Sequence, residues 1–299
     1  MNLKNNSSLF YVESPFQLIQ CVEAIHEFDI KKSKIIIREN SSVNNNEQIR
    51  AVVKALKLNQ CTFMKCHLKS FKGIFLVLRL IFEGYFYRRI FIGDENSRIF
   101  NLSVKFINLN KVVLMDDGVA TLNSNKSWVN FKRFSMFPFG VNTTLNKFSY
   151  LSTYIERQNT YQHIIIGMDL ISAGICTATD YFEFITNVAG KFSSEAASVL
   201  YIPHRNEEQN DLEGLNKIVN IHVQKTRLPI ELVGLELFLQ PITISTFFSS
   251  AIFSMEKIYQ NCQFFIYRIP ECKIHKRRNS IDKIYNHIES TLNFNVINL

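Results

Sequence analysis

Residues 112–118, with the sequence Val-Val-Leu-Met-Asp-Asp-Gly, indicate the fold because four apolar residues lead directly into two carboxylates and a glycine. A short apolar run of this kind is typical of a buried strand. The same arrangement recurs at residues 199–205 (VLYIPHR) and 242–250 (ITISTFFSS), where polar residues again follow an apolar run. Open α/β sheets bind ligands outside the carboxyl ends of their strands. We therefore expect a carboxylate pair, an imidazole and a hydroxyl pair at such sheet edges.

The first half of the chain alternates strand-like and helix-like segments, which predicts parallel βαβ units. Ser14 and Pro15 suit the cap and the first position of a helix. Helical spacing continues through Leu18, Cys21, Val22 and Ile25. We expect strands at residues 9–12, 34–38, 89–92 and 111–115, the last being the final strand of this half, and a second helix at residues 47–58.

Residues 121–153 lose this alternation in an aromatic stretch that includes Trp128 and Tyr150 and is interspersed with Lys and Arg. We interpret it as a linker or a mobile flap near the domain junction. A second alternating series follows, with strands expected at residues 163–167, 199–202, 218–223, 243–247 and 262–266 and a final helix at residues 280–292. The pattern predicts an α/β protein of two Rossmann-like domains, residues 1–155 and 156–299, that face each other across a cleft.

The charge balance favours anionic partners. The chain has 34 Lys and Arg against 26 Asp and Glu, a net charge of +8, and 46% of its residues are hydrophobic. The apolar content is that of a folded globular protein. The positive charge suits nucleotide phosphates, acidic glycans or an anionic membrane surface, without choosing among them.

Cysteine usage and hydropathy indicate the compartment. The six cysteines are scattered without a CxxC pair, and the first eight residues lack the apolar region of a signal peptide. The most apolar stretch, residues 74–82, is about half of the roughly 20 residues needed to span a bilayer and contains Arg79. We expect free thiols, a cytoplasmic location and no transmembrane helix.

Asp116 and Asp117 offer two adjacent carboxylates, and Gly118 permits a turn that a side chain would block. One carboxylate is suited to act as a general base, with a proton affinity set by its neighbour and by partial burial. A simple turn that closes the strand is the structural alternative. Paired aspartates also bind Mg²⁺, although adjacent carboxylates at a strand end usually point apart.

The second half offers three polar candidates. His204 and Arg205 together suit a phosphate, with the imidazolium neutralising charge on a departing group, although a lone histidine is more often a structural hydrogen-bonding residue. Ser249 and Ser250 are placed to cap a helix, with or without an anion at its terminus. Glu231 suits either the start of a helix or the ribose hydroxyls of a nucleotide.

Several enzyme classes lose their main support. The chain lacks a Walker-type phosphate loop, a GxGxxG after its first strand, a GxSxG elbow, an HExxH motif and paired-cysteine zinc spacing. These absences argue against nucleoside triphosphatases, dehydrogenases, serine hydrolases and zinc enzymes.

Taken in order, the motifs resemble those of bacterial sialyltransferases, which have an acidic-acidic-Gly motif, a His-Pro motif and a serine pair. The segment Glu13-Ser14-Pro15-Phe16-Gln17 resembles the start of glycosyltransferase family 52 and of related bacterial polysialyltransferases. The resemblance spans most of the chain, in short motifs. It departs at one place, because Pro203 precedes His204 and Arg205 follows it, where many relatives have His followed by Pro.

The resemblance implies an inverting, metal-independent transferase of GT-B type that needs no cofactor and transfers N-acetylneuraminic acid from CMP-Neu5Ac. Asp117 would be the general base, Asp116 would orient it or contact the acceptor, and His204 would stabilise the leaving phosphate. The N-terminal domain would bind the acceptor, and the C-terminal domain the CMP donor. The expected acceptor-binding residues are Glu13, Ser14, Gln17 and Asp94, and the expected donor-binding residues are His204, Arg205, Glu231, Ser249 and Ser250.

The resemblance further implies a terminal galactose or sialic acid of lipopolysaccharide, O-antigen or capsule as acceptor, with an α2,3 linkage expected. No nucleic acid is expected as partner. A lipid-linked acceptor would place the protein at the inner face of the bacterial inner membrane. The basic residues 273–278 are the candidate contact, with the solvated start of a helix as the simpler account of them. Two alternatives stay open: a transferase for another nucleotide sugar, and a non-catalytic protein that binds acidic glycan or membrane lipid.

Overall fold

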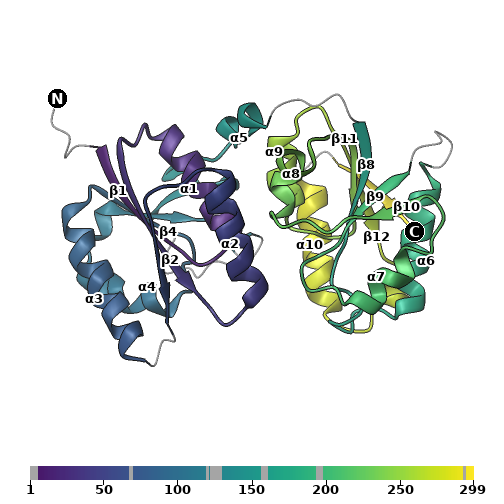
Figure 1. The fold of residues 1–299 in the computed structure, drawn as a ribbon, viewed down its shortest axis with the longest axis horizontal. Helices are drawn as coiled ribbons and strands as arrows, with labels where there is room; N and C mark the ends of the chain where they lie inside the picture. The colour runs from purple at the N-terminus through teal and green to yellow at the C-terminus, as the bar shows by residue number, and fades with distance from the viewer. Residues whose placement is uncertain are drawn as a thin grey trace. The chain divides into compact units, whose positions relative to one another are not determined.

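The computed structural model describes residues 6–66, 70–118, 121, 130–155, 161–192, 198–291 and 294–299 of the chain. Two compact units, Met1–Tyr154 and Ile155–Leu299, make up the molecule. Each unit has its own parallel β-sheet with helices on both faces (Figure 1). The two parallel α/β domains predicted from the alternating pattern are therefore confirmed.

The sheet of unit 1 has the strand order β3-β2-β1-β4-β5-β6-β7, and every pair is parallel. Parallel strands need crossover connections, and helices provide those between the first five strands of the chain. The strands are β1 (Ser7–Val12), β2 (Lys32–Glu39), β3 (Cys61–Lys65), β4 (Arg89–Ile92), β5 (Val112–Met115), β6 (Lys132–Ser135) and β7 (Thr143–Leu145).

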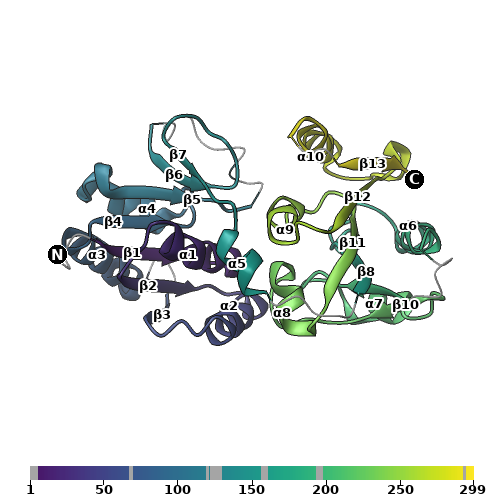
Figure 2. The ribbon, with the colours of Figure 1, turned by 90° about the horizontal axis from the view of Figure 1, so that it is seen from above.

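Helices cover both faces of this sheet, α1 and α2 on one side and α3 and α4 on the other (Figure 2). The first helix begins where the sequence predicted, with Ser14 as its cap and Pro15 in its first turn. The helices are α1 (Pro15–Glu27), α2 (Val43–Ala55), α3 (Phe71–Phe86), α4 (Arg98–Ser103) and α5 (Ser149–Tyr154), with short 3₁₀ turns η2 (Val104–Phe106) and η3 (Leu109–Lys111).

The core beneath α3 and α4 follows from the two periodicities of sheet and helix. Alternate residues of β1 and β4 face these helices, and Leu76 and Leu80 of α3 pack onto them in one buried cluster. Among its members are Leu9, Tyr11, Ile90, Ile92, Ile99 and Phe100. The opposite residues of β1 face the other layer, where Phe10 stacks on Phe91 with ring centroids 4.6 Å apart.

The prediction that residues 111–115 form the last strand of unit 1 is wrong, because β6 and β7 extend the sheet. Both lie within the stretch interpreted as a linker or flap, of which Trp128 lies outside the described residues. The pattern of apolar residues did not indicate β6, because the charged Arg133 stands where an apolar residue would be expected. The Arg133 guanidinium is buried and pairs with Glu95 at 2.8 Å, which makes a charged residue tolerable inside the sheet.

The sheet of unit 2 has the strand order β10-β9-β8-β11-β12-β13, again all parallel. The five strands expected in this half are present with shifted ends, except residues 199–202, whose ends agree. The final strand was not predicted. The strands are β8 (Tyr161–Ile166), β9 (Val199–Ile202), β10 (Ile221–Val223), β11 (Gln240–Thr246), β12 (Gln263–Arg268) and β13 (Asn295–Asn298).

In unit 2, α6 and α7 lie on one face of the sheet and α9 and α10 on the other (Figures 1 and 2). The final helix ends at Thr291, and residue 292, its expected end, lies outside the described residues. The helices are α6 (Ala178–Gly190), α7 (Gln209–Leu215), α8 (Val233–Leu237), α9 (Ile252–Ile258) and α10 (Arg278–Thr291), with 3₁₀ turns η7 (Ile230–Leu232) and η8 (Glu271–Lys273). No helix of the described residues has the length and hydropathy needed to cross a bilayer.

Each sheet has one point at which the strand order reverses. In unit 1, β1 lies between β2 and β4, and in unit 2, β8 lies between β9 and β11. The helices that leave neighbouring strands on the two sides of such a point go to opposite faces, which opens a crevice at the carboxyl edge. The topology therefore locates one candidate ligand site in each unit.

The placement of α3 predicts opposite outcomes for two leucines on it. Leu80 is fully buried and Leu78 is 59% exposed. We expect Leu80→Ala to lower the free energy of unfolding by about 2–5 kcal/mol and Leu78→Ala to change it by about 0.5 kcal/mol or less. Urea unfolding followed by circular dichroism measures both, and equal losses would show that α3 does not present these two faces.

Candidate functional site

Three neighbouring strands of unit 1 end in polar residues at the carboxyl edge of the sheet. Glu13 follows β1, Asp94 follows β4 and Asp117 follows β5, and β4 lies between the other two strands. These loops flank the point where the strand order reverses. The sheet therefore gathers one side chain from each of three distant segments.

Gln17, in the first turn of α1, links these loops. Its Nε2 donates to Oδ1 of Asp117 at 2.9 Å, and its Oε1 accepts from the backbone N–H of Glu13 at 2.7 Å. Its side chain lies against Gly93 at the end of β4, where a Cβ would overlap it. Only glycine at this position leaves room for the glutamine to reach Asp117.

Two aspartates, Asp117 and Asp94, lie at this edge together with Glu13. Asp117 is half-buried, and its backbone N–H donates to Oγ1 of Thr121 at 2.7 Å. Burial, together with the smaller effect of the negative charges of Asp117 and Glu13, raises the pKa of Asp94 to about 6, against a hydrogen bond from the backbone of Asn96 that lowers it. A pKa near neutrality is what a carboxyl group needs for proton transfer at physiological pH.

Asp116 has a different environment from its neighbour. Its side chain is 1% exposed, with Oδ1 accepting from Ser135 Oγ at 2.6 Å and Oδ2 from the backbone N–H of Met136 at 2.7 Å. Burial raises its pKa to about 7, although these two hydrogen bonds lower it. A direct contact with an acceptor, one of the two roles expected for Asp116, does not fit this burial. The carboxylate instead holds the loop after β6 beside Asp117.

Glu13 and Ser14 are engaged within unit 1. The carboxylate of Glu13 accepts from Tyr11 and Ser97 at 2.6 and 2.7 Å and pairs with Arg38 at the end of β2. The hydroxyl of Ser14 accepts from the backbone N–H of Gln17 at 3.3 Å as the cap of α1. Both residues thus hold the edge in shape, and their expected contact with an acceptor stays a prediction.

In unit 2, the loop after β9 is held by a carboxylate that the sequence did not single out. Glu207 accepts from the hydroxyl of Tyr201 and from the backbone N–H of His204, both at 2.5 Å. Tyr201 in turn lies 2.8 Å from the hydroxyl of Tyr181. A Cβ at Gly167, the residue after β8, would overlap both Glu207 and Tyr201, so a glycine again makes room for the contact.

These contacts set the protonation of the loop. Burial raises the pKa of Glu207 to about 7, and the charge of Asp169 after β8 adds to the rise. Desolvation and the nearby Arg205 guanidinium lower the pKa of His204. The expected imidazolium is therefore not the favoured form at neutral pH. Nδ1 of His204 accepts from the backbone N–H of Asn206 at 3.3 Å, which leaves the proton of the neutral ring on Nε2.

Arg205 and Glu231 are brought within electrostatic range of each other. Glu231 lies in η7, is 6% exposed, and accepts from Ser254 Oγ at 3.3 Å. Burial raises the pKa of Glu231, and the charge of Arg205 opposes this. The pair links two segments expected to bind the donor, while contact with a ribose stays a prediction.

Ser249 and Ser250 follow β11, which borders β8 at the reversal of strand order. The expectation that they cap a helix is wrong: α9 begins at Ile252 with Ala251 at its cap and no side-chain cap bond. Ser249 Oγ instead accepts from the backbone N–H of Ala251 at 3.4 Å. Both hydroxyls are half-buried at the carboxyl edge of the sheet.

The described residues include no group of three or more His, Cys, Asp or Glu side chains placed to bind a metal ion. Metal independence stays a prediction.

The two candidate sites differ in the chemical groups that they offer. Carboxylates dominate the edge of unit 1, and an imidazole, a guanidinium and two hydroxyls lie along the edge of unit 2.

Glu207 predicts a dependence of stability on pH. Because its pKa is raised from 4.5 to about 7, the folded chain retains a proton between these values that the unfolded chain releases, so the free energy of unfolding falls as pH rises through this window. Glu207→Gln mimics the protonated form and removes this loss. Relative to the native chain, we expect the variant to gain about 1–3 kcal/mol between pH 5 and pH 8.

Urea unfolding at the two pH values measures this gain. Glu208→Gln, a change of the exposed neighbouring carboxylate, is the matched control and should follow the native profile. Parallel profiles for Glu207→Gln and the native chain would contradict the assigned environment.

No family model and no curated protein matches the chain. Several solved structures, however, are similar to it in fold. UDP-GlcNAc 2-epimerase from Neisseria meningitidis bound to UDP-GlcNAc is similar with a TM-score of 0.55 and 11% identity, covering 95% of this chain and 92% of that one. UDP-GlcNAc 2-epimerase from Methanocaldococcus jannaschii gives a TM-score of 0.54 and 11% identity over 96% and 93%. The Escherichia coli heptosyltransferase WaaC with ADP gives 0.51 and 7% over 95% and 98%. At these identities the likeness shows the fold alone, and that fold is the two-domain, Rossmann-like GT-B type.

Proposed function

We infer that this protein is a glycosyltransferase that uses a nucleotide-sugar donor, and that the donor is CMP-sialic acid. The proposed acceptor is a terminal galactose or sialic acid of a bacterial surface glycan. Two of the proteins with this fold were solved with UDP-GlcNAc and with ADP, which supports a nucleotide-linked substrate. The choice of CMP-sialic acid depends on the order and content of the three motifs.

The observation that carries the proposal is the division of polar groups between the two units. Asp117 and Asp94 lie at the carboxyl edge of one sheet, and His204 and Ser249 lie at that of the other, each set beside the reversal of strand order. Glycosyl transfer needs a base for the acceptor hydroxyl and hydrogen-bond donors for the departing phosphate. The two sets supply these two chemistries.

On the acceptor side, the Asp117 carboxylate removes the proton of the acceptor hydroxyl. As the acceptor oxygen forms its bond to the anomeric carbon of the sialic acid, the bond from that carbon to the phosphate oxygen breaks, and CMP leaves with the electron pair. Gln17 holds one carboxylate oxygen at 2.9 Å, which fixes the direction of the carboxylate. Asp94 lies at the same edge, where the negative charge of Asp117 contributes to the raised pKa of Asp94.

On the donor side, the neutral His204 ring offers its Nε2–H to the phosphate as charge builds on it. Arg205 supplies a fixed positive charge beside it, and the hydroxyls of Ser249 and Ser250 supply further donors. Each donor aimed at the developing charge typically contributes about 2.7–4 kcal/mol to transition-state stabilisation. CMP is itself a good leaving group, so the proposal requires no metal ion.

The assay that tests this proposal follows CMP release from CMP-Neu5Ac with a galactose-terminated acceptor in the presence of EDTA. We expect acceptor-dependent release by the native chain, a loss of about 10³-fold or more in kcat for Asp117→Asn, and a loss of about 10²–10³-fold for His204→Ala. Asp117→Asn should keep its affinity for CMP, because it removes a base and leaves the donor site intact.

The matched controls are Asp29→Asn and His222→Ala, which change an exposed residue of the same type in the same unit. Both should keep native activity. Activity lost in EDTA and restored by Mg²⁺ or Mn²⁺ would move the aspartates to a metal role. Thermal stabilisation by UDP- or GDP-sugars and not by CMP would contradict the donor assignment and favour a transferase for another nucleotide sugar.

A further inference from the structure

Helix α3 is apolar on two opposite faces. Leu76 and Leu80 face the core, together with two buried glycines. The other face carries an α3 stripe, which we define as Phe71, Ile74, Phe75, Leu78, Phe82 and Phe86, side chains between 57% and 91% exposed. These positions recur at helical spacing, so they form one continuous band along the outside of the helix.

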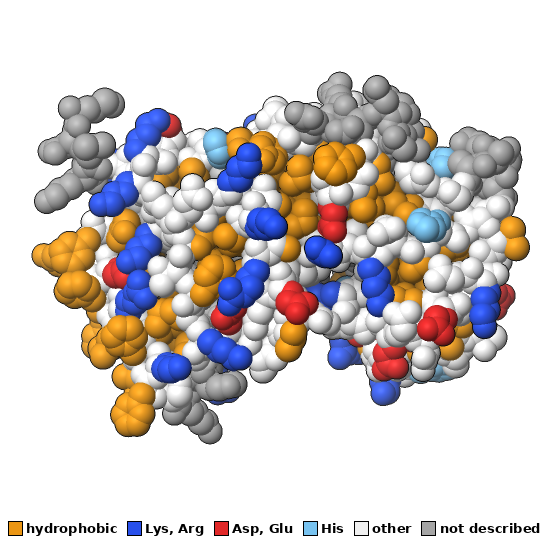
Figure 3. Space-filling view, in the orientation of Figure 1, with side chains coloured by type: hydrophobic (Ala, Val, Ile, Leu, Met, Phe, Trp, Pro, Cys, Tyr) orange, Lys and Arg blue, Asp and Glu red, His pale blue; other side chains and the backbone are white. Residues whose placement is uncertain are grey.

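Apolar side chains exposed along a whole helix face indicate a surface that contacts another molecule or a membrane. Figure 3 shows apolar side chains gathered over the part of unit 1 where Figure 1 places α3, with Lys and Arg side chains beside them. Leu102 and Phe106 of the following segment, 53% and 72% exposed, add to the apolar surface. Contiguous apolar patches on the surface of soluble proteins mark sites that contact proteins or membranes, and aromatic residues dominate this one.

The charge around the stripe is positive. Residues 71–111 contain seven Lys and Arg against three Asp and Glu. Glu83, the acid on α3 itself, is already paired with Arg79 at 2.7 Å and with Lys34. Lys72 in the first turn of α3 and Lys105 in the segment that follows are exposed cations that an anionic surface would attract.

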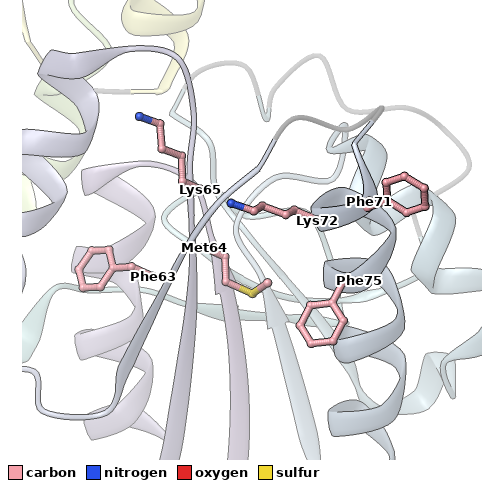
Figure 4. A pocket seen from close by; sticks show the side chains of 6 residues that line it. All are labelled: Phe63, Met64, Lys65, Phe71, Lys72 and Phe75. Carbon is pink, nitrogen blue, oxygen red and sulfur yellow. The ribbon is translucent and has the colours of Figure 1, made fainter.

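A cavity of about 490 Å³ lies at the start of α3, lined by Phe63, Met64 and Lys65 of β3 and by Phe71, Lys72 and Phe75 of α3. Figure 4 shows the two lysine side chains at one end of it and Met64 with the rings of Phe63 and Phe75 at the other. An amphiphile with a negatively charged head and an apolar tail matches this division. The cavity shares Phe71 and Phe75 with the α3 stripe and extends it toward β3, which adds a place for one lipid molecule to the same surface.

We propose that the α3 stripe, with Lys65 and Lys72, is a membrane-docking surface that binds anionic lipid bilayers from one side without crossing them. Aromatic side chains of a surface helix enter the interface between headgroups and acyl chains, and flanking lysines attract anionic lipid. A second copy of this chain is the less fitting occupant, because an isologous contact would bring the positive rims together.

This surface differs from the basic residues 273–278 considered from the sequence. There, Lys273 is paired with Asp180, and Arg278 donates to the carbonyl of Ile274. No large apolar side chain is exposed within residues 243–291. Electrostatic attraction alone binds membranes weakly, whereas α3 combines charge with apolar area. The proposal does not depend on the reaction that the protein catalyses.

Vesicle flotation with the full chain tests the proposal, with vesicles of phosphatidylcholine alone and of phosphatidylcholine with phosphatidylglycerol. The native chain should float with the anionic vesicles, less at physiological than at low salt. The triple variant Phe71→Ser, Phe75→Ser, Phe82→Ser should bind at least about tenfold more weakly at both salt concentrations. The double variant Lys65→Gln, Lys72→Gln should lose about tenfold on anionic vesicles only.

Two controls keep the result specific: Val219→Ser, at an apolar residue 80% exposed in unit 2, and the double variant Lys276→Gln, Arg277→Gln. Both should float like the native chain, and all variants should keep the native melting temperature because the changed side chains are exposed. A native chain that binds neither vesicle at low salt overturns the proposal. So does a loss of binding in the Lys276, Arg277 variant alone, or a dimer in sedimentation velocity that the Phe variant dissociates.

Discussion

The hydrogen bond from Gln17 to Asp117 is the contact on which the candidate site of unit 1 depends. It joins the first turn of α1 to the end of β5 across the intervening strand β4, and the missing side chain of Gly93 makes room for it. The bond fixes the carboxylate, and Ser14 fixes the helix that carries Gln17. The position of Asp117 is therefore a property of three segments, and the Asp-Asp-Gly turn alone does not determine it.

Unit 2 also has a glycine at a strand end that makes room for a polar side chain. Gly167 at the end of β8 leaves room for Glu207, whose carboxylate holds the backbone of His204 and the hydroxyl of Tyr201. In both units a glycine at the end of a strand beside the reversal of strand order admits a polar side chain from elsewhere in the chain. Polar groups that are buried and fully paired define one geometry, because leaving any of them unpaired is costly.

Apolar runs followed by polar residues predicted the parallel sheets and the strand ends that carry Asp117 and His204, because burial and strand direction are encoded locally. The sequence could not predict β6, where Arg133 is buried by a pairing with Glu95, 38 positions away. Nor could it distinguish the buried Asp116 from its half-buried neighbour, since that difference arises from contacts with Ser135 of β6 and with Met136 directly after it. Gly93 follows a predicted strand and Gly167 is the last residue of another, so the sequence did indicate a glycine at each of these strand ends. The contacts of Glu207 with Tyr201 and with the backbone of His204 could be found only from the folded structure.

We propose that the edge of unit 2 binds the nucleotide and that the carboxylates of unit 1 do not. Hydrogen–deuterium exchange of the full chain with and without CMP tests it most directly. We expect slower exchange of the amides in residues 204–207 and 249–252 on addition of CMP, with residues 113–118 unchanged. Slower exchange confined to the edge of unit 1, with the loops after β9 and β11 unaffected, would contradict it.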